Sequence, residues 1–264
     1  MTARLSRRAG ALTLVAAAAA ATLTGCDQGF GAAKLTFDDT EKVKITEVVV
    51  SGTRGDVSVR TAPIAETRIK RIVRSDGADP GVSYRLTGTS LAVDTSCGPN
   101  CRVSYDIEAP TGVAVRGELT SGGLNLVQVG SADVTVNSGE IHLDRITGRT
   151  TATARSGNIV AEGLAGPATL TTRSGNIDGT NLTGGNAITA EATSGNIELE
   201  LMQPASVTAR VSSGNVDLAV PPGAYRVAHH VGSGDFESDV SSDPKATAVL
   251  DVRAGSGNAT ITSQ

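Results

Sequence analysis

Large aromatic side chains are nearly absent from this chain of 264 residues, which has no tryptophan, three tyrosines and three phenylalanines. So few rings cannot fill a broad globular core, because aromatic residues bury the largest areas. Glycine is abundant, with 31 residues. The composition therefore predicts a narrow interior built from small and branched aliphatic side chains.

A clustered excess of positive charge is also missing. The chain has 23 lysines and arginines against 27 acidic residues, which gives a formal net charge of −4. Binding to nucleic acid needs a cationic surface that matches the phosphates. We therefore expect no nucleic-acid partner.

No catalytic or cofactor motif is recognisable. The chain contains no Gly-x-Ser-x-Gly, no His-Glu-x-x-His and no phosphate-binding loop at the start of a helix. Its histidines are His142, His229 and His230. The last two are neighbours on an expected strand, so they face opposite sides and make a poor metal pair. We expect no metal, no cofactor and no enzymatic activity.

The N-terminal residues have the features of an export signal. Basic residues at Arg4, Arg7 and Arg8 precede an apolar stretch, 9–23, that is shorter than a membrane span. The stretch ends in Leu-Thr-Gly-Cys, 23–26, which resembles the lipobox of bacterial lipoproteins. That resemblance implies a signal peptide over 1–26, a diacylglycerol on Cys26, and a protein anchored outside the cytoplasm to the bacterial cell membrane.

Two alternatives stay open for this segment. One is an ordinary secretory signal with a chance cysteine. The other concerns the route, because Ser-Arg-Arg-Ala-Gly, 6–10, fits twin-arginine as well as general export. Residues 27–34 are expected to form a short polar tether next to the membrane.

Two further cysteines, Cys97 and Cys101, are separated by Gly-Pro-Asn, which are turn-forming residues. In an oxidising compartment such a pair is expected to form a disulfide at the tip of a hairpin. A redox-active pair is the alternative, but the spacing is not Cys-x-x-Cys and no βαβ pattern surrounds it.

A Ser-Gly step recurs along the second half of the chain. The serines are Ser121, Ser138, Ser156, Ser174, Ser194, Ser213, Ser233 and Ser256, spaced by 17, 18, 18, 20, 19, 20 and 23 residues. A period of this kind is typical of repeat architectures. Polar and apolar residues alternate on both sides of each step, which predicts a strand, a tight turn and a second strand.

These units predict an all-β fold, a single-stack parallel β-solenoid or β-helix over residues 111–264. Its coils, of about 18–20 residues, are expected to stack in chain order about 4.8 Å apart. Glycine permits a positive φ at each corner. The asparagines after the glycines are expected to form a hydrogen-bonded ladder of corner residues: Asn158, Asn176, Asn196 and Asn215.

Residues 35–110 are expected to form a separate N-terminal β cap over the first coil, because an open end exposes core and unpaired backbone. Alternation between turn signals predicts its strands over 45–50, 56–60, 68–73, 83–86, 91–94 and 102–107.

Columns, meaning the same position in successive coils, separate inside from outside. Two columns are expected to point inward. Three residues after the serine lie Ile141, Ile159, Ile177, Ile197, Val216 and Phe236, and two residues before it lie Val136, Ala154, Thr172, Ala192, Val211 and Val231.

Acidic residues gather in two outward columns. Four residues after the serine lie Asp178, Glu198, Asp217 and Glu237, and six residues after it lie Asp144, Glu162, Glu200 and Asp239. Such columns would attract a cationic partner, although like charges on neighbouring strands repel. The alternative is a solvated face that keeps the protein soluble. Arginines precede the corners at Arg155, Arg173 and Arg210, so we expect the opposite charge on another face.

The corners Ser-Gly-Asn-Ile, Ser-Gly-Asn-Val and Ser-Gly-Asp-Phe follow a Cys-bearing hairpin and Glu-Ala-Pro-Thr-Gly-Val-Ala-Val, 108–115. From about Val43 onward this set resembles the bacterial "putative adhesin" β-solenoid domain family. The resemblance implies a non-catalytic, adhesin-like binding or structural module of the cell envelope. Some members are linked to envelope stress and to sensing cationic antimicrobial peptides, so an unidentified envelope or extracellular ligand, with a cationic one as an option, is expected.

One alternative belongs to another class. Several carbohydrate-active enzymes that act on envelope or extracellular polysaccharides are β-helices. They need carboxylates in a cleft and usually aromatic platforms for the sugar, and this chain has no tryptophan.

Overall fold

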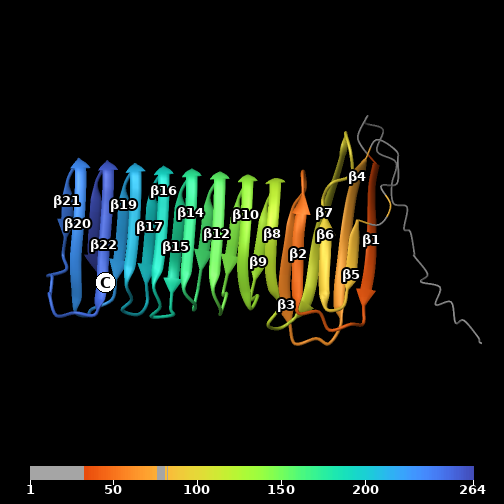
Figure 1. Cartoon of the computed structure of the whole chain (residues 1–264), viewed down its shortest axis with the longest axis horizontal. Helices are drawn as coiled ribbons and strands as arrows, with labels where there is room; N and C mark the ends of the chain where they lie inside the picture. The colour runs from red at the N-terminus through yellow and green to blue at the C-terminus, as the bar shows by residue number, and fades with distance from the viewer. Residues whose placement is uncertain (1–32, 76–80, 82) are drawn as a thin grey trace, which may run out of the picture.

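Two β-sheets extend along the whole described chain (Figure 1). The computed structural model describes residues 33–75, 81 and 83–264. These residues form a 12-stranded sheet, here sheet A, and an 11-stranded sheet, here sheet B, and contain no helix. The prediction of an all-β fold with stacked parallel strands is confirmed.

The strands of the two sheets alternate along most of the chain. In spatial order, sheet A contains β1 (Ala33–Glu41), β4 (Thr67–Ser75), β7 (Cys101–Pro110), β3 (Val57–Ala62), β9 (Leu124–Val127), β11 (Ile141–Asp144), β13 (Ile159–Glu162), β15 (Ile177–Leu182), β17 (Ile197–Leu201), β19 (Val216–Val220), β23 (Ala259–Ser263) and β21 (Phe236–Ser238). Sheet B contains β20 (Tyr225–Ser233), β22 (Ala248–Ser256), β18 (Val207–Ser213), β16 (Ile188–Ser194), β14 (Ala168–Ser174), β12 (Thr150–Ser156), β10 (Ser131–Ser138), β8 (Ala114–Ser121), β2 (Glu47–Gly52), β6 (Ser90–Asp94) and β5 (Tyr84–Thr87).

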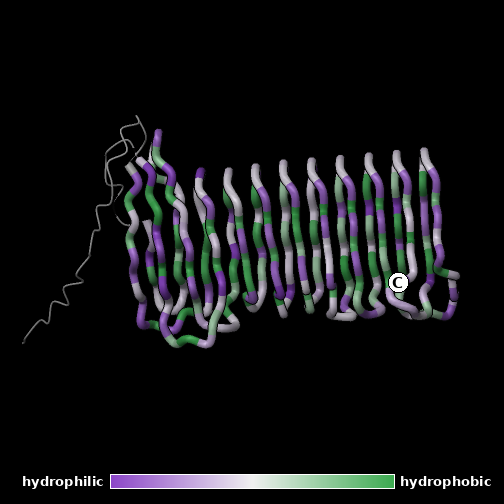
Figure 2. Tube along the Cα trace, turned by 180° about the vertical axis from the view of Figure 1, so that it is seen from behind, coloured by the Kyte–Doolittle hydropathy of each residue, from purple (hydrophilic) through white to green (hydrophobic). Residues whose placement is uncertain are grey.

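Each coil from β8 onward, like the coil of β2 and β3, consists of one strand of sheet B, a corner at a Ser-Gly step and one strand of sheet A. Neighbouring coils pair in parallel with their corner serines opposite one another, as Ser138 with Ser156 and Ser156 with Ser174. Buried and exposed residues alternate along most strands, and the hydropathy along the tube in Figure 2 alternates in the same way. The same position in neighbouring coils therefore shares a column.

Asparagines connect the corners along the stack. The backbone N–H of Asn176 donates to Oδ1 of Asn158 at 2.9 Å, and the N–H of Asn196 donates to Oδ1 of Asn176 at 2.9 Å. The ladder continues through Asn215 and Asn258 with the same distance. The asparagine ladder that the repeat predicts is present.

Glycine is required beside each asparagine. Gly175 has a φ of +141°, and a Cβ at this position would overlap the carbonyl oxygen of Gly157 in the neighbouring coil. Only glycine combines this φ with so close an approach of two backbones. The repeated Ser-Gly-Asn is therefore a structural motif of the corner.

Aliphatic side chains of both sheets fill the interior. The inner members of the predicted inward columns are buried: Ile141, Ile159, Ile177, Ile197, Val216, Val136, Ala154, Thr172, Ala192 and Val211. The last members, Val231 and Phe236, are only half-buried because they lie in the outermost coil. The hydroxyl of Thr172 donates to the carbonyl of Gly157 at 3.1 Å, which satisfies the polar member of the core.

The last two coils are not stacked in chain order, and on this point the prediction is wrong. β22 and β23 pair with β18 and β19 on one side and with β20 and β21 on the other. The interior of the inserted coil is apolar, whereas β20 places His229 at the inward position opposite Val252. An imidazole is tolerated in the last coil because it keeps its contact with water there. The connection 239–247 returns the chain and accounts for the long final spacing.

The strands before residue 111 belong to the same two sheets. β2 pairs in parallel with β6 and β8, and β3 pairs in parallel with β7 and β9. Beyond these coils, β4 pairs with β7, β1 with β4, and β5 with β6, all antiparallel. Each strand predicted in this region overlaps one of β2 to β7, whereas the sequence pattern predicts no strand at β1.

A disulfide joins Cys97 to Cys101 between β6 and β7, with the Cα atoms 5.5 Å apart. Gly98 and Asn100 have positive φ angles of +95° and +54°, as a tight turn requires. The predicted disulfide is confirmed, but the hairpin expected around it is wrong: β6 lies in sheet B and β7 in sheet A, so the disulfide closes a corner between the two sheets. The signal peptide and Cys26 lie outside the described residues, as does the tether up to residue 32, and β1 begins inside the segment expected as tether.

Candidate functional site

Asp178, Glu198 and Asp217 lie side by side on the outer face of sheet A. They belong to β15, β17 and β19, and each follows a buried aliphatic residue, so each points outward. Asp178 pairs with Glu198, and Glu198 pairs with Asp217. Neighbouring members are therefore about 4.8 Å apart. We call these three residues the acidic column.

The fourth residue expected in this column is separated from it. Asp217 pairs with Thr260, and Thr260 pairs with Glu237. The coil inserted between β19 and β21 therefore places a neutral hydroxyl between the two carboxylates.

The second group of expected acidic residues is dispersed. Asp144 pairs with Glu162, but Glu162 pairs with Thr180 on its other side. Glu200 pairs with Ala219. Asp239 follows the end of β21, where its N–H donates to the carbonyl of Ile261 at 2.9 Å. The register between β15 and β17 shifts after Gly179, which interrupts this column.

The acidic column has no internal cation. Among the described residues, no lysine, arginine or histidine forms an ion pair with Asp178, Glu198 or Asp217. By contrast, Asp144 is paired with Arg145 at 2.7 Å. Burial raises the pKa of Asp178, and the negative charge of Glu140 raises it further. Within the described residues the column therefore carries negative charge that no ion pair compensates.

A hollow of about 300 Å³ lies beside two members of the column. Glu198, Asp217 and Glu200 line it together with the side chains of Thr260 and Thr262. Carboxylates accept hydrogen bonds and hydroxyls both donate and accept them. The hollow can thus hold a positively charged group with several hydrogen-bond donors.

The arginines expected on another face lie on sheet B. Arg155 on β12 and Arg173 on β14 occupy one column and are exposed. Arg210 on β18 is engaged differently, since its guanidinium binds Glu191 at 3.1 Å and Asp251 at 2.9 Å. Among the described residues Arg155 and Arg173 form no ion pair, so their positive charge lies on sheet B, opposite the acidic column.

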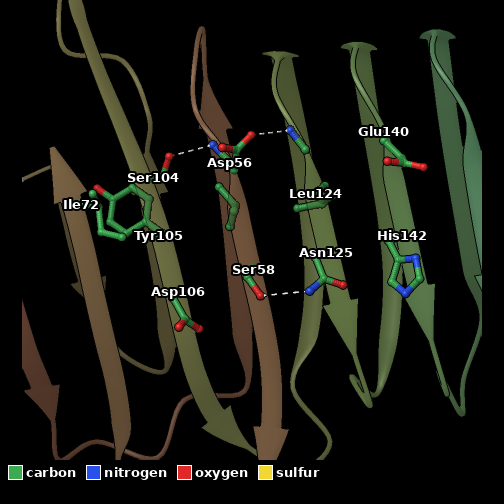
Figure 3. Close-up of a pocket in the computed structure, with 12 residues that line it drawn as sticks. Asp56, Ser58, Ile72, Ser104, Tyr105, Asp106, Leu124, Asn125, Glu140 and His142 are labelled. Atoms are coloured by element: carbon green, nitrogen blue, oxygen red, sulfur yellow. Dashed lines mark hydrogen bonds between the residues drawn. The ribbon is translucent and has the colours of Figure 1, made fainter. Parts of the chain in front are cut away.

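A second hollow, of about 230 Å³, was not predicted from the sequence (Figure 3). It lies over β7, β3, β9 and β11, and some of its polar groups bind one another. Asp56 accepts the backbone N–H of Gly123 at 2.9 Å, Asn125 donates to Ser58 at 3.3 Å, and Asp106 is ion-paired outside the hollow. The hollow depends on the pairing of β3 with β7 and β9, which no local pattern reveals.

The histidines do not lie together in a metal site. No group of three or more His, Cys, Asp or Glu side chains in the described part of the chain is arranged to hold a metal ion. His229 points into the last coil and stacks on Phe236, with ring centroids 3.7 Å apart. Within the same described residues, no helix has the length and apolar composition of a membrane span.

Two long sheets of mostly parallel strands, joined coil by coil at Ser-Gly-Asn corners, define a solenoid-like all-β protein. Within that class, the family model of Toastrack DUF4097 matches residues 31–262, and the chain belongs to this family. The resemblance to an adhesin-like bacterial family that the corners indicate is thereby confirmed.

Two solved structures are similar to the chain. A "putative adhesin" from Bacteroides fragilis NCTC 9343 is 16% identical to this chain, with a TM-score of 0.43. The match covers 89% of this chain and 100% of the Bacteroides chain. A "putative cell adhesion protein" from Clostridium sporogenes ATCC 15579 is 12% identical, with coverages of 86% and 99% and a TM-score of 0.25. At this level neither structure carries an argument about what this chain binds. No curated protein matches the chain significantly.

Proposed function

We propose that this chain is a non-catalytic binding module of the bacterial envelope that recognises a cationic ligand at the acidic column. The observation that supports this proposal is the alignment of Asp178, Glu198 and Asp217 in one strand register without an internal cation. Like charges on neighbouring strands cost stability. A cationic ligand would offset this repulsion. Its interaction with the aligned carboxylates is therefore more favourable than with scattered ones.

The proposal also covers location. The N-terminal export features and the lipobox-like Leu-Thr-Gly-Cys support an extracytoplasmic protein that is lipid-anchored at Cys26. The disulfide between Cys97 and Cys101 is consistent with an oxidising compartment. In this arrangement β1, β4 and β5 would cap the end of the stack that faces the membrane. A Cys26→Ser variant should lose the lipid and leave the detergent phase on phase partitioning.

Binding of a fluorescent oligolysine peptide to the full chain tests the ligand class. We expect binding at 20 mM NaCl that weakens strongly at 500 mM, because exposed charges are screened. The variant Asp178→Asn/Glu198→Gln/Asp217→Asn should bind at least tenfold more weakly. A matched control, Asp38→Asn/Glu66→Gln/Asp133→Asn, removes the same charge elsewhere and should bind like the natural chain. Equal loss in both variants would reduce the effect to net charge and overturn the proposal.

The geometry favours binding over glycoside hydrolysis. A glycosidase places two carboxyl groups on opposite sides of the bond that it cleaves. The carboxylates of the acidic column instead lie in one line on one face of sheet A. Burial raises the pKa of Asp178, yet this residue does not line the neighbouring hollow.

A further inference from the structure

The coil formed by β20 and β21 leaves its interior open at one end of the stack. These two strands are outermost in their sheets (Figure 1). Val227, Val231 and Phe236 point inward but are only half-buried. The inward residues of the neighbouring coil, by contrast, are at most 1% exposed: Leu250, Val252, Ala254 and Ala259. Apolar surface that every other coil buries is therefore exposed to water here.

The corner of this coil also has unmatched hydrogen-bonding groups. The N–H of Asp235 donates to Oδ1 of Asn258 at 3.1 Å, which continues the ladder. The Asp235 carboxylate stands where each inner asparagine accepts an N–H from the next coil, and no next coil exists among the described residues. Gly257 donates its N–H to Ser233 at 2.9 Å, whereas the equivalent N–H of Gly234 has no partner in the described part of the chain.

The connection 239–247 covers only part of the β20 edge. Ser242 forms a parallel bridge with Tyr225, and its hydroxyl accepts the N–H of Val227 at 3.0 Å. Asp243 donates its N–H to the carbonyl of Tyr225 at 2.7 Å. From Ala228 to Ser233 no strand of the described chain lies outside β20. The end of the stack is therefore a step. The half that the connection covers extends one strand further along the stack than the open half.

We propose that this end binds the same end of a second copy of the chain. A two-fold axis perpendicular to both the stack and the strands reverses the strand direction. The raised connection of each copy then lies against the open half of β20 in the other copy, so the two steps fit. Exposed strand edges pair readily with another chain in this way.

Hydrogen-bonding groups suit the same arrangement. The imidazoles of His229 and His230 on the open half of β20 can donate to the carboxylates of Asp239 and Asp243 on the connection of the other copy. Nothing on the open half of the edge provides the lysine or proline with which natural proteins block edge pairing. The proposal does not depend on the acidic column. If the Cys26 anchor of the proposed function also holds, the paired end lies away from the membrane, where copies on two facing membranes can meet.

Sedimentation of the full chain in detergent, from 1 to 100 µM, tests this inference. We expect a monomer–dimer equilibrium without larger species. Val231→Glu places a charge on the open interior and should raise the dimer dissociation constant at least tenfold. Met202→Glu adds the same charge to an exposed hydrophobic residue elsewhere, at 48% exposure, and should leave the dimer unchanged.

Hydrogen exchange of the natural chain provides a second measurement that needs no variant. β20 already pairs with β22 within one copy, so only its outward amides report the dimer. The N–H of Val227 points away from β22 to Ser242, and the next amides on that side, those of His229 and Val231, should be protected at 100 µM and exchange freely at 1 µM. A monomer at all concentrations, a dimer that tolerates Val231→Glu, or growth into open-ended chains would each overturn the inference. Loss of oligolysine binding would not, since that concerns only the acidic column.

Discussion

Asn196 shows how one side chain serves two coils. Its N–H donates to Asn176, and its Oδ1 accepts the N–H of Asn215 at 2.9 Å. Corner N–H groups point along the stack and need an acceptor from the neighbouring coil. At the other end, the carboxylate of Asp56 does this for the N–H of Gly123. An acceptor oxygen, rather than the amide as a whole, is what the corner requires.

Replacing Asn196 tests this requirement. Asn196→Ala leaves the N–H of Asn215 without its acceptor and should lower the free energy of unfolding by about 0.5–1.5 kcal/mol. Asn196→Asp keeps an acceptor oxygen and should cost clearly less. Urea denaturation monitored by circular dichroism measures both. Equal losses for the two variants would show that the ladder hydrogen bond does not contribute.

At the scale of strands, the ionised side chain of Asp178 lowers the stability of the sheet that carries it. Asp178 and Glu198 are directly opposite on β15 and β17. Burial and the charge of Glu140 raise the pKa of Asp178 above its ordinary value of 3.8 in the folded state. The folded state thus binds the proton more tightly than the unfolded state does. Ionisation of Asp178 therefore opposes folding at every pH above the folded pKa.

Asp178→Asn should consequently stabilise the protein at neutral pH. Removing one of two like charges on neighbouring strands is worth up to about 1 kcal/mol. The melting temperature of the variant should exceed that of the natural chain at pH 7, and the difference should vanish as the pH falls below 3.8. Asp38→Asn, on an exposed position of β1, is the control. A difference that does not change with pH would contradict this account.

Strands and their inward faces could be predicted from the sequence because period-two alternation is a local signal. The columns through Ile159, Ile177 and Ile197 followed directly from the repeat. The order of the coils could not, because every coil has the same corner and the same inward pattern. One weak signal was present: a histidine at an inward position, His229, suits only an end coil. Because the order of the coils was not predictable, the sequence pattern wrongly predicted that Glu237 is next to Asp217. Thr260 lies between them.

At the scale of the whole molecule, the chain fills its stack out of order at both ends. The coil of β2 and β3 lies between coils formed later, by β6 and β7 and by β8 and β9. At the other end, β20 and β21 take the outermost level before β22 and β23 fill the level beneath them. The strand pairs that hold the outermost coil are therefore completed only by residues that come after it in the chain.

Thiol cross-linking should report this order directly. In a Cys26→Ser background, Asp217→Cys/Thr260→Cys places thiols on adjacent strands, about 4.8 Å apart, whereas Asp217→Cys/Glu237→Cys places them about two strand spacings apart. Glu198→Cys/Asp217→Cys is adjacent in either order and serves as the control. A cross-linker with a span of about one strand spacing should join the first pair as fast as the control and the second pair far more slowly. Faster cross-linking in the Asp217→Cys/Glu237→Cys variant than in the Asp217→Cys/Thr260→Cys variant would mean that the coils follow chain order. The step at the β20 edge, with the pairing inferred from it, would then be lost.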